Sequence, residues 1–61
     1  MGERIAYYRK HINLSQKELA EAIGVRQVDV SRWENDVFKP NVDTLKALAD
    51  AFGCSVDSLL S

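Results

Sequence analysis

The chain has 61 residues, which allows one domain and leaves no room for a second hydrophobic core. Its net charge of −1 at pH 7 counts against nucleic-acid binding, because domains with that role are often strongly basic. The charge is uneven, since residues 1–39 carry seven Lys or Arg against six Asp or Glu, and residues 40–61 carry one lysine against three aspartates. Charge alone therefore does not decide the class of partner.

The sequence offers little material for catalysis, cofactor binding or membrane insertion. Its single cysteine, Cys54, excludes an internal disulfide framework, and no cluster has zinc-ligand spacing. His11 stands without a second histidine or paired carboxylates near it in the sequence. No apolar run approaches the ~20 residues that span a membrane, and none resembles a signal peptide. We therefore expect a cytoplasmic protein that is not an enzyme and holds no metal or cofactor.

Apolar residues recur at helical spacing, and strand signals are almost absent. A first helix is expected over about residues 2–12, ended by Asn13, which tolerates the left-handed conformation. Ser15 and Glu18 have the spacing of a capping box at the start of a second helix, which Gly24 ends. The residues expected on the inner faces of these helices are Ile5, Tyr8, Arg9 and Ile12, then Leu19, Ala20 and Ile23.

A link of three residues, 24–26, separates the second helix from a third over about residues 27–35, which is typical of a helix-turn-helix. Asn41 is expected to cap a fourth helix that ends at Gly53, and Ser55 to cap a short fifth helix. Their apolar faces consist of Leu45, Leu48, Ala49 and Phe52, and of Val56, Leu59 and Leu60. The fold class is therefore all-α, with five short helices around one core.

The two sides of the third helix differ in an unusual way. Val30 and Trp33 fall on one side and suit a buried face, at 100° per residue. A side that met only water would more often carry Glu and Lys, yet the opposite side holds a valine among polar groups. We infer that this side faces another molecule; its residues are Gln27, Val28, Ser31, Arg32 and Asn35.

The segments LSQKELAEAIGVRQVDVSRWEN, KP and VDTLKALADAFGCSVDSLL together resemble the Cro-like phage-repressor helix-turn-helix family, also called the Xre family. The resemblance runs without a gap from about Ile5 to Leu60. It implies a compact five-helix fold like that of lambda repressor, with the second and third helices forming the helix-turn-helix. It also implies that the third helix lies in the major groove of DNA, with its first residues at the base edges.

The resemblance implies that Gln27, Val28 and Arg32 read bases. A glutamine can pair with adenine, an arginine with guanine, and a valine can pack on the methyl group of thymine. Ser31 lies on the same side and is expected near a base or a phosphate. The plainer alternative is that Val28 is a tolerated exposed apolar residue, which is common.

Phosphate contacts are expected on both flanks of the third helix. The resemblance assigns Gln16 to a phosphate at the start of the second helix, where free N–H groups favour anions. On the other flank we expect Asn35, Lys39 and Phe38, the last through its backbone N–H. Arg26 stands where the family usually has a capping Ser or Thr, at a cost of ~1 kcal/mol that Asp29 can offset. It either reaches DNA or pairs with Asp29, and both interpretations stay open.

Two further roles follow from the resemblance. Arg9 and Glu34 match an ion pair that ties the first helix to the third, a structural contact whose loss costs ~3–5 kcal/mol if fully buried. Asp36 stands where the family commonly has glycine, so a left-handed backbone is expected there.

The leading interpretation is a single domain over residues 1–61 that binds double-stranded DNA in a sequence-specific way, as a transcriptional regulator and most plausibly a repressor. One recognition helix reads few base pairs, so we expect a homodimer on a palindromic operator with half-sites ~34 Å apart. Val56 and Leu60 are candidate dimer contacts, although such residues also close cores. The alternative is a protein-interaction module of the same fold, which holds a toxin or a polymerase subunit and binds DNA secondarily.

Overall fold

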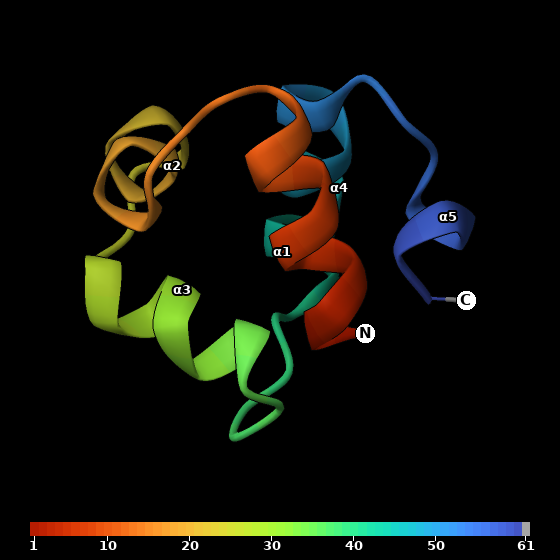
Figure 1. Ribbon diagram of the computed structural model, residues 1–61. Helices are drawn as coiled ribbons and strands as arrows, with labels where there is room; N and C mark the ends of the chain where they lie inside the picture. The colour runs from red at the N-terminus through yellow and green to blue at the C-terminus, as the bar shows by residue number, and fades with distance from the viewer. Residues whose placement is uncertain (61) are drawn as a thin grey trace.

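The computed structural model describes residues 1–60, and in that range it contains five helices and no strands. Helices α2 and α3 lie side by side at one edge of the molecule and α5 lies at the opposite edge, with α1 and α4 between them (Figure 1). The bounds of the helices are Gly2–His11 for α1, Gln16–Ile23 for α2, Gln27–Glu34 for α3, Val42–Phe52 for α4 and Val56–Leu60 for α5. The expected all-α class and the order of the elements are confirmed.

One apolar core joins all five helices. Ile5, Leu19, Val30, Leu48 and Leu59 have no exposed surface, so each helix contributes one completely buried side chain. Around them pack partly buried residues from the same helices and from the turns, among them Tyr8, whose ring stacks on that of Phe52 with centroids 5.7 Å apart. The inner faces expected from the sequence spacing are the faces that the fold buries.

Short polar side chains begin three of the helices. Ser15 Oγ accepts from the Glu18 amide at 3.0 Å while the Glu18 carboxylate accepts from the Ser15 amide at 2.8 Å, which completes the expected capping box. The Asn41 side chain accepts from the Thr44 amide at 2.8 Å.

Helix α5 begins in the same way, since Ser55 Oγ accepts from the Ser58 amide at 3.2 Å. All three caps satisfy backbone N–H groups that a helix leaves unpaired at its start.

Helix α3 begins differently, because its N-cap residue, Arg26, has no acceptor oxygen in its side chain. Asp29 supplies the other half of a capping box, since its carboxylate accepts from the Arg26 amide at 3.2 Å. This hydrogen bond, together with those from the Arg26 side chain, lowers the pKa of Asp29. Asp29 therefore offsets the missing side-chain cap of Arg26, as the sequence predicted.

Left-handed residues end the first four helices. The positive φ angles belong to Asn13, Gly24, Asp36 and Gly53, at 59°, 77°, 58° and 69°. At each of these turns the next amide donates back to a carbonyl five residues earlier, for example from Val37 to Arg32 at 2.9 Å. Asn13 and Asp36 thus adopt the conformation that the sequence predicted for them. Helices α1 and α3 end one residue before the expected bounds, because Ile12 and Asn35 are already the capping residues.

A carboxylate of α3 joins three helices. Glu34 accepts from Arg9 Nε at 2.6 Å and from Arg9 Nη2 at 3.1 Å, which confirms the contact between α1 and α3. Gln16 Nε2 of α2 donates to the same carboxylate at 3.0 Å, and Arg9 Nη1 also donates to the Leu14 carbonyl at 2.8 Å. The two charged side chains are only 11% and 8% exposed, and their hydrogen bond raises the pKa of Arg9.

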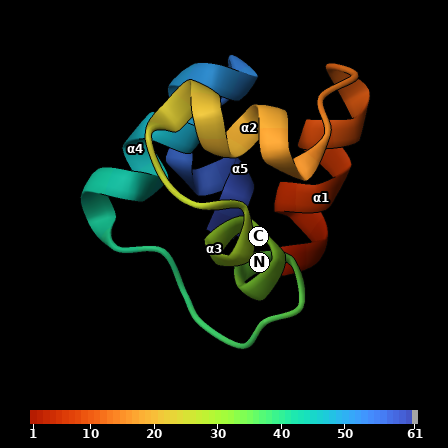
Figure 2. The ribbon, with the colours of Figure 1, turned by 90° about the vertical axis from the view of Figure 1, so that its left-hand side faces the viewer.

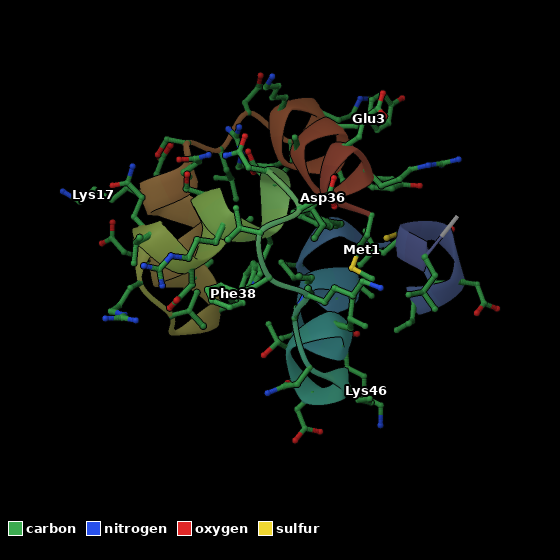
Figure 3. All side chains as sticks on the ribbon, turned by 90° about the horizontal axis from the view of Figure 1, so that it is seen from below. Met1, Glu3, Lys17, Asp36, Phe38 and Lys46 are labelled. Carbon is green, nitrogen blue, oxygen red and sulfur yellow. The ribbon has the colours of Figure 1, made fainter. Side chains whose placement is uncertain are left out.

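The start of α1 lies directly against the end of α3. A Cβ atom on Gly2 would come within 2.4 Å of the Trp33 carbonyl oxygen and 2.5 Å of the Glu34 carbonyl oxygen, so only glycine fits there. The Gly2 amide donates to the Asp36 carboxylate at 3.0 Å, and Figure 3 shows Met1 and Asp36 close together. No local sequence pattern marks Gly2, because the backbone atoms that it approaches are more than 30 residues away in the chain.

Replacing Arg9 by methionine tests the network around Glu34. The variant leaves a largely buried carboxylate without its cation, and we expect the free energy of unfolding to fall by about 3 kcal/mol. The total free energy of unfolding of a domain of this size is roughly 3–9 kcal/mol. The expected loss is therefore a large part of the total. Urea unfolding followed by fluorescence of the single tryptophan, Trp33, measures the change. Arg4→Met, on the exposed side of α1, is the matched control; if both variants unfold alike, the pair has no structural role.

The capping carboxylate of Asp29 predicts a pH dependence of stability. Its pKa is lower in the folded state than in the unfolded chain, so its contribution is complete above about pH 4 and is lost as the pH falls through the folded-state value. We expect Asp29→Asn to be less stable than the parent chain at pH 7, and the difference to shrink as the pH falls toward 2. A constant difference in urea midpoint across this range would contradict the assignment.

Candidate nucleic-acid interface

Helix α3 presents one apolar side to the core and one mixed side to solvent. Val30 is completely buried and Trp33 is 8% exposed, whereas Val28 is 41% exposed, and Gln27 and Arg32 are also exposed. Ser31 is half-buried, at the margin between the two sides. Figure 2 shows α3 and the turn that joins it to α2 on the face toward the viewer. The residues predicted to read bases therefore share one accessible face.

The structure brings Gln16 next to this face but gives its side chain an internal partner. Gln16 lies in the first turn of α2 and is half-buried, with Nε2 donating to Glu34. A side-chain amide nitrogen carries two hydrogens, so one remains for another acceptor. The network holds the amide beside the start of α2, where backbone N–H groups are free.

Arg26 pairs with Asp29, as one of the two interpretations expected. The Nη2–Oδ1 distance is 3.5 Å and the Arg26 side chain is 76% exposed. An exposed pair of this length contributes little, and the guanidinium can turn away from Asp29 at small cost. The pairing and a contact with DNA are therefore compatible.

Asn35 uses its side chain locally. Its Nδ2 donates to the Ser31 carbonyl, four residues earlier, at 2.8 Å, as a second donor beside the Asn35 backbone amide at 3.0 Å. An asparagine at the C-cap of a helix is the sequence feature that indicates such a local hydrogen bond. Its exposed position keeps the residue beside the face of α3.

The loop from α3 to α4 carries the other residues that were expected to contact DNA, and one of them forms a side-chain contact that no local sequence pattern indicates. Phe38 and Lys39 are exposed, and Val37 beside them is 62% exposed. The guanidinium carbon of Arg32 lies over the Phe38 ring, 5.5 Å from its centroid. Figure 3 labels Phe38, which lies beside the green ribbon of α3 in that view.

The candidate dimer residues lie in α5, at the edge opposite α3 (Figure 1). Leu60 is 53% exposed, whereas Val56 is partly buried against the core and Leu59 is completely buried. Leu59 thus closes the core, as the alternative interpretation held, and Leu60 is the accessible apolar residue of this helix.

Residues 1–60 show few features of metal binding, membrane insertion or cysteine reactivity. No three His, Cys, Asp or Glu side chains in this range are grouped so that they could hold a metal ion. No helix within the same residues is both long and apolar enough to cross a membrane. Burial raises the pKa of the Cys54 thiol, which favours the protonated, unreactive form.

Comparison with known proteins identifies the family. The sequence model of a family described as helix-turn-helix matches residues 5–59. Repressor protein C2 of Salmonella phage P22 is 43% identical over 60 residues, which are 98% of this chain and 28% of that repressor. The chain thus spans well under half the length of this curated relative.

Solved structures agree with the sequence comparison. The P22 c2 repressor in complex with a synthetic operator superposes with a TM-score of 0.91 at 41% identity, over 95% of this chain and 88% of that one. SinR of Bacillus subtilis, a regulator of biofilm formation solved in complex with DNA, superposes with a TM-score of 0.90 at 33% identity. The superposition covers 97% of this chain and 98% of the SinR chain. With five helices among residues 1–60, a helix-turn-helix formed by α2 and α3, and these similarities, the chain belongs to the Cro- and Xre-type helix-turn-helix family.

Proposed function

We propose that residues 1–61 form one DNA-binding domain of a transcriptional repressor, which reads the major groove of double-stranded DNA with α3. The observation that carries the proposal is the exposed side of α3, where Val28 is 41% exposed among Gln27, Ser31 and Arg32. The P22 c2 and SinR relatives were solved on DNA, which supports the same partner here. The role is binding in the cytoplasm, without catalysis.

The chemistry of each side chain suits one feature of the major groove. Gln27 can donate to and accept from adenine, and Arg32 can donate twice to guanine. Val28 supplies apolar surface, and the thymine methyl is the apolar group that the groove presents. Ser31, at the margin of the face, is assigned to a base or a neighbouring phosphate.

The phosphate contacts surround this face. Gln16 is assigned to a phosphate through its second amide hydrogen and the free N–H groups at the start of α2. Asn35 and Lys39 are assigned to the phosphates of the other flank, together with the backbone N–H of Phe38, and Arg26 at the start of α3 is assigned to a phosphate as well. Because several of these donors are neutral, a chain of net charge −1 can bind DNA. The salt dependence should be modest, with a slope of about −0.9 for each phosphate that a cation neutralises.

Two copies on a palindromic operator would supply the specificity that one helix lacks. Half-sites about 34 Å apart place two recognition helices in successive major grooves. The exposed side chain of Leu60, with the accessible part of Val56, is assigned to the contact between the copies.

Selection from random duplexes tests the proposal. We expect the parent chain, at moderate salt, to enrich one symmetric sequence, and Arg32→Ala to weaken binding to it by about 5- to 150-fold with a relaxed preference at one G·C pair. Arg4→Ala, on α1, is the control with the same change of charge and should keep the full preference.

Two outcomes would contradict the proposal. The absence of any enriched sequence would favour the protein-interaction module. Equal weakening by Arg32→Ala and Arg4→Ala would show that α3 contributes charge without reading bases.

A further inference from the structure

Arg32 and Phe38 come from different elements and meet on the exposed face of α3. Arg32 lies in the last part of the helix and Phe38 in the loop that follows, and the guanidinium carbon is 5.5 Å from the ring centroid. Phe38 is 57% exposed, so the ring is not held there by burial in the core. Its position therefore needs another explanation.

The turn at the end of α3 places the ring. The Val37 amide donates to the carbonyl of Arg32 itself at 2.9 Å, and the Asp36 amide donates to the Trp33 carbonyl at 3.1 Å. Asp36 is left-handed with φ 58°, which reverses the chain at this point. Phe38 thus follows directly from a backbone segment that is hydrogen-bonded to the residue whose side chain it contacts.

The far side of the loop is held as well. Pro40 is buried and Asn41 caps α4 through its hydrogen bond with the Thr44 amide at 2.8 Å. The ring lies between these two anchored ends, three residues before the cap of α4. Its backbone is consequently restrained on both sides although its side chain is exposed.

The position of the guanidinium carbon over the Phe38 ring leaves the N–H groups of Arg32 able to bind a base. A guanidinium is planar and weakly hydrated, and it stacks on an aromatic face while its N–H groups point outward in its own plane. Two of these donors in one plane match O6 and N7 of guanine. A long side chain that is already held in this orientation loses less conformational freedom on binding than one that moves freely.

We propose that Phe38 is a specificity-determining positioning residue, which holds the Arg32 guanidinium for in-plane recognition of guanine. The inference rests on the proposed function of α3 and adds to the backbone contact assigned to Phe38 above. It makes the preference for one G·C pair depend on a side chain outside the recognition helix.

A double-mutant cycle on the duplex enriched by the parent chain tests the proposal. We expect Phe38→Leu to weaken binding to this duplex by about 2- to 5-fold and to lower the preference for guanine at the Arg32-dependent pair by the same factor. In the Arg32→Ala background, Phe38→Leu should have no further effect. Phe38→Tyr keeps an aromatic face and should restore the preference.

Two controls separate positioning from other roles. Val37→Ala removes exposed apolar surface from the same loop and should leave the guanine preference unchanged. In the free protein, the NMR signals of the Arg32 δ protons should carry a ring-current shift that Phe38→Leu removes and Phe38→Tyr retains.

The proposal is overturned if Phe38→Leu leaves the preference intact, weakens all duplexes equally, or acts equally in the Arg32→Ala background. An intact preference would show that Phe38 has no role in recognition. Equal weakening of all duplexes, or an equal effect in the Arg32→Ala background, would show that Phe38 contacts DNA independently of Arg32. Failure of this inference can be told apart from failure of the proposed function. If the proposed function fails, Arg32→Ala itself leaves the base preference of the parent chain unchanged.

Discussion

Glu34 accepts hydrogen bonds from Arg9 of α1 and from Gln16 of α2, so one carboxylate of α3 connects the three helices around the candidate interface. Such a carboxylate is costly to desolvate, and the arrangement is stable only while its donors stay in place. The same contact orients Gln16 at the start of α2. A structural ion pair and a proposed phosphate contact are therefore parts of one network.

The outward face of α3 depends on few inward contacts. The helix has eight residues, and Val30 and Trp33 supply its buried side chains. So short a helix has little stability of its own, and the Asp29 cap, the left-handed turn at Asp36 and the Glu34 network all act on its ends. Val28 and Arg32 are therefore not needed for packing of the core. Their side chains can be chosen for binding a ligand without loss of core stability.

The turn at Asp36 has three consequences for the proposed interface. It ends α3, it brings a carboxylate to the Gly2 amide at 3.0 Å, and it directs the following loop so that Phe38 lies under Arg32. The end of α3, the start of α1 and the orientation of Arg32, a side chain that we propose reads a base, are thus coupled through a few residues of backbone. A change in this turn is expected to alter DNA recognition even where it spares the core.

The positions of the helices follow from residue order, because their signals act over three to five residues: the caps at Ser15, Asn41 and Ser55, and the left-handed ends at Asn13, Gly24 and Gly53. The spacing of apolar residues also separated the buried side of α3 from its exposed side. The Arg9–Glu34 pair was predicted from family resemblance, since neither residue alone indicates its partner.

Contacts that join distant segments, or that depend on the path of a loop, became evident from the packing of the helices alone. Nothing local shows that Gly2 must approach the carbonyls of Trp33 and Glu34, or that the Gln16 amide turns inward. The contact between the Arg32 guanidinium and the Phe38 ring likewise requires the direction that the chain takes after its reversal at Asp36. The physical reason is that hydrogen bonds and caps within a helix follow from residue order, whereas these contacts follow from how the packed helices place their ends.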